Sequence, residues 1–312
     1  MKTCVRRSHK SDRAPVSKYH PGHLEAAGSL EKQMKTDRST LLNVGLTVAV
    51  MFTAIAGVER SASADGSGNG TPTNPLATGN LINISTPDIL ASEQVGFRGD
   101  VRAFSDAAGT VVFSPSLRYG LSNNWEIGLG ASLAPYQNFY VPGGGLTRYG
   151  GNDVEVSAKY ATQVAGKYGI GFQAGIGLPN TPFQKSTQLT VGATGTVAAG
   201  SSLNLYVNPR AVLLTDNSIL GIGLGASVKL SQQLSWIGDY TPIISGSNSV
   251  DPFTGDSRRR DIYGFALRYV TMSSNVTLDL GWTNGMGTTT GSSLTPGFGN
   301  SAAWYVSLNF KR

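Results

Sequence analysis

The stretch Trp125–Leu133, with the sequence WEIGLGASL, alternates apolar residues with small or charged ones. Its Trp, Ile, Leu, Ala and Leu fall on one face of an extended chain, and its Glu, Gly, Gly and Ser fall on the other. Successive side chains of a β-strand point to opposite faces, so this period of two predicts a strand with two different faces. The pattern recurs over Tyr168–Leu178 and Leu220–Leu230.

About twelve such runs follow one another along the chain, each roughly 9–13 residues long. A tilted strand needs about 9–11 residues to cross a bilayer, whereas strands of globular proteins average about 5–6 residues. The sequence therefore predicts an all-β fold, a transmembrane antiparallel up-and-down β-barrel of about twelve strands over 93–312. The runs are 93–105, 109–121, 125–135, 152–164, 167–178, 187–199, 203–215, 218–230, 234–245, 259–271, 275–285 and 300–311.

The connections between the runs support this prediction. Those after the even runs are tight, whereas several of the others form longer loops, at 136–151, 179–186, 246–258 and 286–299. Short turns at one end and longer loops at the other are typical of outer-membrane barrels. Aromatic residues are expected at both ends, as two interfacial girdles. The predicted girdles are Tyr119, Trp125, Tyr160, Tyr168, Trp236, Tyr269 and Phe310 at the periplasmic end, and Tyr136, Tyr140, Tyr263, Trp282 and Trp304 at the outer end. A soluble β-sandwich is the alternative, but its strands would be short and its outward face charged.

Charge is sparse and unevenly placed. The formal net charge is +6, yet only 14% of residues are charged, against about 25% in ordinary globular proteins. Residues 1–64 hold ten of the 25 basic and five of the 19 acidic residues, which leaves 15 basic and 14 acidic residues in 65–312. A net charge near zero in that part gives no support for nucleic-acid binding.

The N-terminal region reads as an export signal. An apolar run over 41–58 follows Lys35 and Arg38 and precedes Ala62-Ser63-Ala64, the layout of a cleaved signal peptide. We expect a signal peptide over 34–64, with a transmembrane helix as the alternative. Residues 1–33 are a doubtful extension, and the Gly- and Pro-rich residues 65–92 are expected to form a flexible lead-in.

The only cysteine, Cys4, and all three histidines lie before residue 34. The exported chain would therefore lack thiol nucleophiles, Ser-His-Asp catalysis and the usual zinc ligands. We expect no enzyme activity, no metal and no cofactor.

Assigning the more apolar face to lipid leaves a set of charged residues for the lumen, because charges facing lipid would be costly. These candidate pore-lining residues are Arg98, Asp100, Arg102, Arg118, Glu126, Glu155, Lys159, Arg210, Lys229, Asp239, Arg268 and Asp279. Either they line a weakly basic pore, with the five arginines as its constriction, or they pair across strands and fill a closed barrel.

Several segments resemble a known family. Residues Tyr119–Gly130, with the sequence YGLSNNWEIGLG, are similar to the YGLT-x-x-x-E-x-G-x-G hairpin of the phenol-degradation meta-pathway family of outer-membrane barrels, and Ser157–Tyr160, Gly169–Pro179 and Asp279–Gly281 resemble later parts of that family. The resemblance implies a 12-strand barrel that aids uptake of small, often hydrophobic or aromatic, compounds. The last strand resembles the signal read by the barrel-assembly machinery, although Lys311 and Arg312 follow Phe310.

Together these observations predict a passive channel for small solutes in the outer membrane of a diderm bacterium, in contact with its lipid. The alternative is a structural or surface-interaction barrel with a plugged lumen. A secreted soluble β-protein is a third possibility.

Overall fold

The computed structural model describes residues 78–105, 110–141, 145–164, 168–180, 187–214, 217–251, 256–271, 276–297 and 300–312. The predicted signal peptide, the extension before it and the first part of the predicted lead-in lie outside these residues. Within them, no helix is long and apolar enough to span a membrane.

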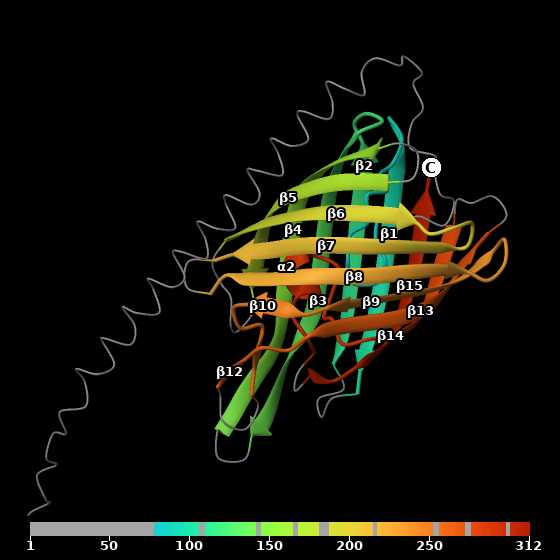
Figure 1. The fold of residues 1–312 in the computed structure, drawn as a ribbon. Coiled ribbons are helices and arrows are strands. Elements are labelled where there is room, and N and C mark those ends of the chain that lie inside the picture. The colour runs from blue at the N-terminus through green and yellow to red at the C-terminus, as the bar shows by residue number, and fades with distance from the viewer. Residues whose placement is uncertain are drawn as a thin grey trace, which may run out of the picture. The chain divides into compact units, whose positions relative to one another are not determined.

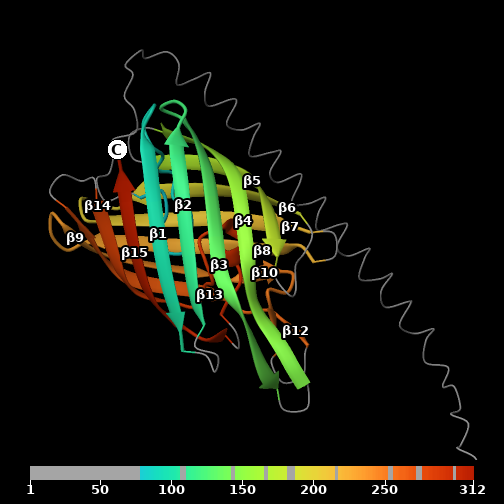
Figure 2. The same cartoon turned by 180° about the vertical axis from the view of Figure 1, so that it is seen from behind.

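Twelve antiparallel strands, each paired with its neighbours, form a closed barrel (Figure 1). The ring closes where β1 pairs with β15, while β8 pairs with β9 on the other side (Figure 2). All twelve runs predicted from the period of two correspond to these strands, so the predicted fold class is confirmed. The strands are β1 (Val95–Phe104), β2 (Val111–Gly120), β3 (Trp125–Val141), β4 (Gly145–Val164), β5 (Tyr168–Asn180), β6 (Gln188–Ala198), β7 (Leu203–Leu213), β8 (Ile219–Lys229), β9 (Leu234–Thr241), β13 (Ile262–Val270), β14 (Val276–Thr283) and β15 (Ala303–Lys311).

Three short strands lie outside this ring. β10 (Ile243–Ser245) continues beside β8, and β11 (Ser249–Val250) pairs with β12 (Ser257–Arg258) in a small separate sheet. The short connections 121–124, 199–202 and 230–233 lie at one end of the barrel, called here the short-turn end. The opposite end is called the long-loop end.

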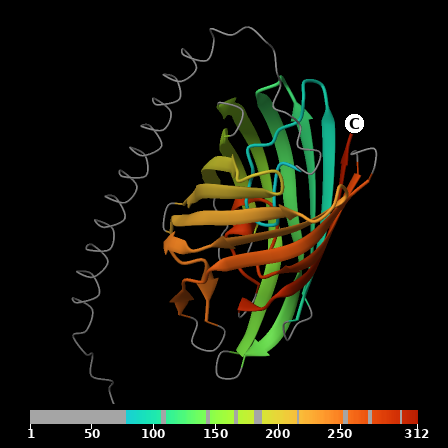
Figure 3. The ribbon, with the colours of Figure 1, turned by 45° about the vertical axis from the view of Figure 1, so that its right-hand side comes forward.

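The predicted loop over 136–151 is wrong, because β3 and β4 continue through it as a hairpin. These strands are 17 and 20 residues long, and beyond Leu133 and Asn152 they pair only with each other. Figure 3 shows the hairpin extending past the other strands. Tyr, Phe, Val and Thr are frequent in this stretch and favour extended structure, so pairing between the two strands continues without further neighbours.

The barrel wall is apolar outside and polar inside. On β1, Phe97 and Val101 are 42% and 43% exposed, whereas Arg98 between them is 1% exposed. Every other barrel strand also exposes large apolar side chains to a similar extent, including Val156 on β4 and Leu189 on β6. A soluble protein would have the opposite arrangement, and exposed apolar side chains of this extent form the lipid-facing belt of a transmembrane barrel. The β-sandwich alternative is therefore excluded.

Aromatic side chains gather at both ends of this belt. Trp125 and Tyr168 are exposed at the short-turn end, and the Trp125 ring lies 5.2 Å from the Tyr160 ring. At the other end, Trp282 stacks on Trp304 with their ring centroids 4.4 Å apart. These positions agree with two interfacial girdles.

Residues 78–90, named here the plug hairpin, lie inside the barrel (Figure 3). The hairpin is closed by hydrogen bonds from Leu81 N to Ile84 O and from Thr86 N to Gly79 O, both 3.0 Å. Leu81, Ile82 and Ile84 are at most 2% exposed. The prediction of a flexible lead-in over 65–92 is therefore wrong for residues 78–90. The composition of this stretch is that of a loop, but side chains of the barrel wall contact it and hold it in one conformation.

A second segment enters from the long-loop end. Residues 284–297, named here the outer insert, connect β14 to β15 and contain the short helix α2 (Thr290–Ser293). Leu294 at the end of α2 is fully buried against Val212, Ile219, Ile243 and Ile262. Residues 286–297 of the loop predicted over 286–299 thus fold inward.

Candidate functional site: the lumen

Paired charges line the wall where β1, β13, β14 and β15 meet. Arg98 lies 2.8 Å from Asp100, which also lies 3.5 Å from Arg102. Arg268 lies 2.8 Å from Asp279, its partner in the register of β13 and β14. The hydroxyl of Tyr305 joins the two groups, since it accepts a hydrogen bond from Arg98 at 2.8 Å and donates one to Asp279 at 3.2 Å. Ion pairs within β1 and between β13 and β14 thus fix the directions of these side chains.

Asp239, on β9, holds the tip of the plug hairpin. Its carboxylate accepts hydrogen bonds from Ile82 N at 2.9 Å, Asn83 N at 2.8 Å and Asn83 Nδ2 at 2.8 Å. Hydrogen bonds to a carboxylate in a buried setting are stronger than those between neutral groups. This carboxylate is therefore the main anchor of the hairpin tip.

Basic side chains of the wall bind carbonyl oxygens of the plug hairpin. Lys159 donates to Asp88 O at 2.8 Å and to Gly79 O at 3.2 Å. Each of four arginines donates to one such carbonyl, so the lumen cations are engaged by the main chain of the hairpin. The pairs are Arg98 with Leu81 O, Arg102 with Ile82 O, Arg210 with Asn83 O and Arg268 with Asn80 O.

Glu126 fastens the other end of the hairpin. It accepts a hydrogen bond from Leu90 N at 2.9 Å and lies 3.2 Å from Arg118. Close by, Gly120 approaches the carbonyl of Ala91 so closely that a Cβ there would lie 1.9 Å from it. Glycine at 120 therefore lets the chain pass from the hairpin into β1.

The outer insert is held by carboxylates of β4. Glu155 accepts hydrogen bonds from Thr290 N and Thr290 Oγ1, both 3.0 Å, and Asp153 accepts one from Thr289 Oγ1. Ser132 and Ser292 share a hydrogen bond of 2.8 Å. The wall thus binds the outer insert through β3 and β4.

The two segments meet inside the barrel, and two arginines contact both. Arg102 donates to Asn83 Oδ1 at 3.1 Å and to Gly285 O at 2.6 Å. Arg210 donates to Asn83 O and, at 2.9 Å, to Ser293 Oγ. A Cβ at residue 285 would lie 2.4 Å from Asn83 Oδ1, so this close approach requires glycine.

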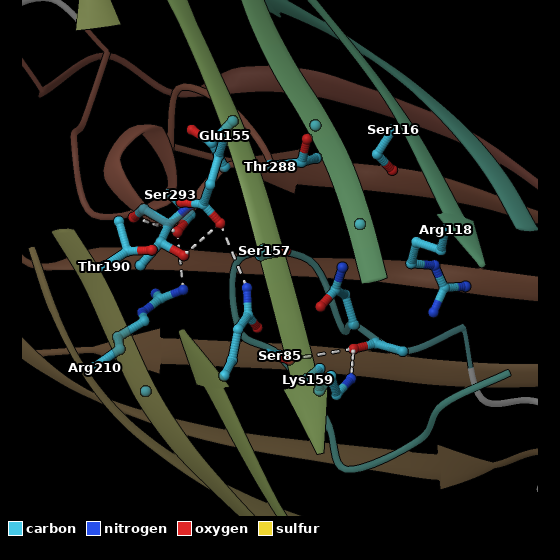
Figure 4. A pocket seen from close by; sticks show the side chains of 18 of the residues that line it. Ser85, Ser116, Arg118, Glu155, Ser157, Lys159, Thr190, Arg210, Thr288 and Ser293 are labelled. Atoms are coloured by element: carbon cyan, nitrogen blue, oxygen red, sulfur yellow. Dashed lines mark hydrogen bonds between the residues drawn. The ribbon is translucent and has the colours of Figure 1, made fainter. Parts of the chain in front are cut away.

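A cavity of about 80 Å³ is left between these segments and the wall. Figure 4 shows Glu155, Arg210 and Ser293 gathered on one side of it, and Arg118 and Lys159 on the other. Water occupies about 30 Å³ per molecule in the liquid, and sites for small molecules measure about 300–1,000 Å³. This cavity has room for a few water molecules and is smaller than such sites, so the described residues leave little space for a solute between the two segments and the wall.

Eleven of the twelve candidate residues face the lumen. Ten are buried, and the side chain of the eleventh, Arg118, is 16% exposed. Lys229 is the exception, since it is the last residue of β8 and is exposed at the short-turn end. Most of these eleven residues contact the plug hairpin or the outer insert.

The buried lining does not carry the basic excess that was predicted. Asp153, which is 5% exposed, was missed although it lies in the predicted run 152–164 with the same phase as Glu155 and Lys159. Without Lys229 and with Asp153, six basic side chains face six acidic ones. The basic ones are Arg98, Arg102, Arg118, Lys159, Arg210 and Arg268, and the acidic ones are Asp100, Glu126, Asp153, Glu155, Asp239 and Asp279.

Asn83 was also missed, since it lies in the Asn- and Pro-rich stretch that predicts a lead-in. No signal in the local sequence points to it, because its partners are more than 15 positions away. In the part of the chain that the structure describes, no group of three or more His, Cys, Asp and Glu residues could hold a metal ion.

Searches against family models and against curated proteins find no match, so the resemblance to the phenol-degradation family is not confirmed. Among solved structures, the chain is similar to the NanC porin, with 12% identity, a TM-score of 0.48 and coverage of 69% of this chain and 98% of that one. It is also similar to an outer membrane channel from Pseudomonas putida F1 (11% identity, TM-score 0.43, 72% and 96% covered) and to the CymD monoaromatic hydrocarbon channel (10% identity, TM-score 0.44, 79% and 93% covered). Similarity at this level carries no argument about function, which must come from the lumen itself. By its own structure, the chain is a twelve-strand transmembrane β-barrel that holds two inserted segments, the plug hairpin and the outer insert, in its lumen.

Proposed function

We propose that this protein is an outer-membrane channel of a diderm bacterium for small polar solutes, and that the plug hairpin closes it. The observation that carries the proposal is the way the lumen is filled. The plug hairpin and the outer insert are separate from the wall, and both are held largely by hydrogen bonds to polar side chains. A barrel filled permanently would be expected to use wall side chains for this, as small barrels do.

The wall of the barrel does not depend on the plug hairpin, so a path for solutes can open when the hairpin leaves. If the plug hairpin leaves, the wall keeps its strands and their pairing, because none of the twelve strands includes residues 78–90. The vacated lumen would be lined by the paired charges described above, which are costly to desolvate against a hydrocarbon. A polar solute therefore fits this lining better than the aromatic compounds that the family resemblance implies.

Export and assembly complete the proposal. We expect the signal peptide over 34–64 to direct export, and the last strand, β15, to be read by the barrel-assembly machinery through its alternating apolar residues up to Phe310. The exposed apolar belt would then contact outer-membrane lipid.

The rival function is a sealed structural barrel, in which the plug hairpin and the outer insert never leave the lumen. Liposome swelling with small sugars separates the two. A channel gives solute flux that rises when the hairpin is weakened by Asn83→Ala, while Lys229→Ala at the barrel end leaves the flux unchanged. A sealed barrel gives no flux with either variant, although both migrate as folded barrels in a heat-modifiability gel.

A further inference from the structure

The wall holds the plug hairpin mainly by main-chain atoms. Seven main-chain carbonyl oxygens of the hairpin accept hydrogen bonds from wall side chains. Four main-chain amides of the hairpin donate hydrogen bonds to wall side chains. The carbonyls belong to Gly79, Asn80, Leu81, Ile82, Asn83, Ser85 and Asp88, and the amides belong to Ile82, Asn83, Ser85 and Leu90.

Side chains of the hairpin add few polar contacts to the wall. Among the described residues, the side-chain hydrogen bonds between hairpin and wall run through Asn83, which contacts Asp239, Arg102 and Thr283. The wall thus recognises an amide backbone with little dependence on sequence.

The same surface offers an apolar pocket. Leu81, Ile82 and Ile84 pack together with four wall residues of the lumen, Tyr206, Ile237, Ala266 and Tyr305. Polar groups that match successive peptide units, beside a pocket for aliphatic side chains, are the two features that peptide-binding surfaces combine.

Other solutes satisfy only half of this surface. A hydrocarbon would fill the apolar pocket but would not replace the three hydrogen bonds that Asp239 accepts from the hairpin, which is costly for a buried charged group. A saccharide would supply hydroxyl groups but no branched aliphatic side chain for the pocket. A peptide supplies both.

We propose that the lumen wall is a peptide-binding site, and that short peptides with branched aliphatic side chains occupy it in place of the plug hairpin. The proposal rests on the channel function above and names its class of solute. The hairpin then acts as a tethered competitor, and a peptide that enters the lumen binds the groups that the hairpin releases.

The tether decides how the proposal must be tested. A segment linked directly to β1 competes at an effective concentration in the millimolar range, so a free peptide displaces it poorly. Asn83→Ala removes the hairpin's side-chain hydrogen bonds and leaves every wall residue unchanged. This variant therefore weakens the competitor without altering the proposed site.

Occupancy of the hairpin can be read by a disulfide. Pro87 Cβ lies 3.4 Å from the position a Cβ would take at Gly169 on β5, close to the 3.5–4.5 Å that disulfides need. The pair Pro87→Cys and Gly169→Cys is combined with Thr196→Ser, because a Thr196 methyl lies 2.7 Å from that position, and with Cys4→Ser. These substitutions leave Tyr206, Ile237, Ala266 and Tyr305 unchanged, and Thr196→Ser keeps the hydroxyl at the position that pairs with Tyr206.

The experiment adds millimolar probes to this Asn83→Ala protein in detergent and measures the yield of the disulfide. The probes are the capped peptide Asn-Leu-Ile-Asn-Ile, pentaglycine and maltopentaose. We expect the first peptide to lower the yield most, pentaglycine to lower it less because it lacks aliphatic side chains, and maltopentaose to leave it unchanged. Equal effects of peptide and saccharide, or no effect of either peptide, would overturn the proposal.

Direct binding gives a second readout that does not depend on the disulfide. Fluorescence anisotropy of a labelled Asn-Leu-Ile-Asn-Ile peptide is measured on the Asn83→Ala protein with and without Asp239→Asn in the wall. We expect Asp239→Asn to weaken binding by about tenfold, the effect of one lost hydrogen bond to a charged group, and Lys229→Ala to have no effect. Neither readout needs transport, so a barrel that binds peptide but gives no flux would contradict the channel function and leave the binding site standing.

Discussion

Asp239 and Asn83, which are 156 positions apart in the sequence, are joined by two hydrogen bonds of 2.8 Å, one from the main-chain amide of Asn83 and one from its side chain. This contact joins the plug hairpin to β9 near the place where the outer insert meets it.

Loss of the carboxylate at 239 should release the hairpin tip. Asp239→Ala removes three hydrogen bonds to a buried charged group, and we expect the free energy of hairpin opening to fall by about 3 kcal/mol, roughly a 100-fold rise in opening. Hydrogen exchange at the amides of Ile82 and Asn83 measures it. Asp239→Asn keeps one acceptor oxygen, so its exchange rates should lie between those of the unaltered protein and of Asp239→Ala. Exchange in Asp239→Ala that matches the unaltered protein would contradict the role of Asp239 as the anchor.

Asn83 should contribute to closure in its own right, because its side chain also accepts hydrogen bonds from Arg102 and Thr283. We expect Asn83→Ala to raise hairpin opening by about tenfold, read as a lower yield of the 87–169 disulfide. Asn80→Ala is the matched control in the same hairpin, since the contacts of Asn80 with Arg268 and Thr78 use its main-chain carbonyl. An equal fall in disulfide yield in both variants would contradict a specific role of Asn83, because any shortened side chain in the hairpin would then have the same effect.

The outer insert should stay in place when the channel opens. Ser132 Oγ and Ser292 Oγ lie 2.8 Å apart, so Ser132→Cys with Ser292→Cys is expected to form a disulfide that fixes the insert to β3. In an Asp239→Ala background we expect planar-bilayer conductance to persist after oxidation of this pair. Conductance that vanishes on oxidation and returns on reduction would make the outer insert the moving part.

The lipid-facing belt predicts a large penalty for a charge at its centre. Leu129 is 50% exposed on the outer face of β3, and we expect Leu129→Arg to lower the free energy of unfolding in vesicles by about 2–4 kcal/mol. Ser201→Arg, at an exposed position in the turn between β6 and β7, serves as the control and should change it little. Urea titration of folding into lipid vesicles gives both values, and a neutral result at 129 would place this surface outside the membrane.

Much of the wall could be predicted from the sequence, because the period of two is a local property. Phe97, Arg98 and Asp100 already separate lipid face from lumen face in the printed sequence, and eleven of the twelve candidate residues lie where that phase puts them. Lys229 fails since the phase says nothing about where a strand ends.

The contents of the lumen could not be predicted, because they depend on contacts between distant segments. The sequence around Asn83 is typical of a loop. Its hydrogen bonds with the distant residues Asp239, Arg102 and Thr283 hold it in an ordered hairpin. The charge balance changed for another reason, since Asp153 has the phase of Glu155 in the printed sequence but was left out of the candidate residues, and its contacts with Thr289 and Gln188 place it in the lumen.

The central claim, that the plug hairpin is the gate of a channel, is tested most directly by planar-bilayer conductance of one protein with the hairpin fixed and then freed. The protein carries Asp239→Ala with Pro87→Cys, Gly169→Cys, Thr196→Ser and Cys4→Ser. The account predicts a silent barrel when the 87–169 disulfide is formed and stepwise conductance after a reductant is added. A folded barrel that stays silent after reduction, or one that conducts equally before and after, would contradict it.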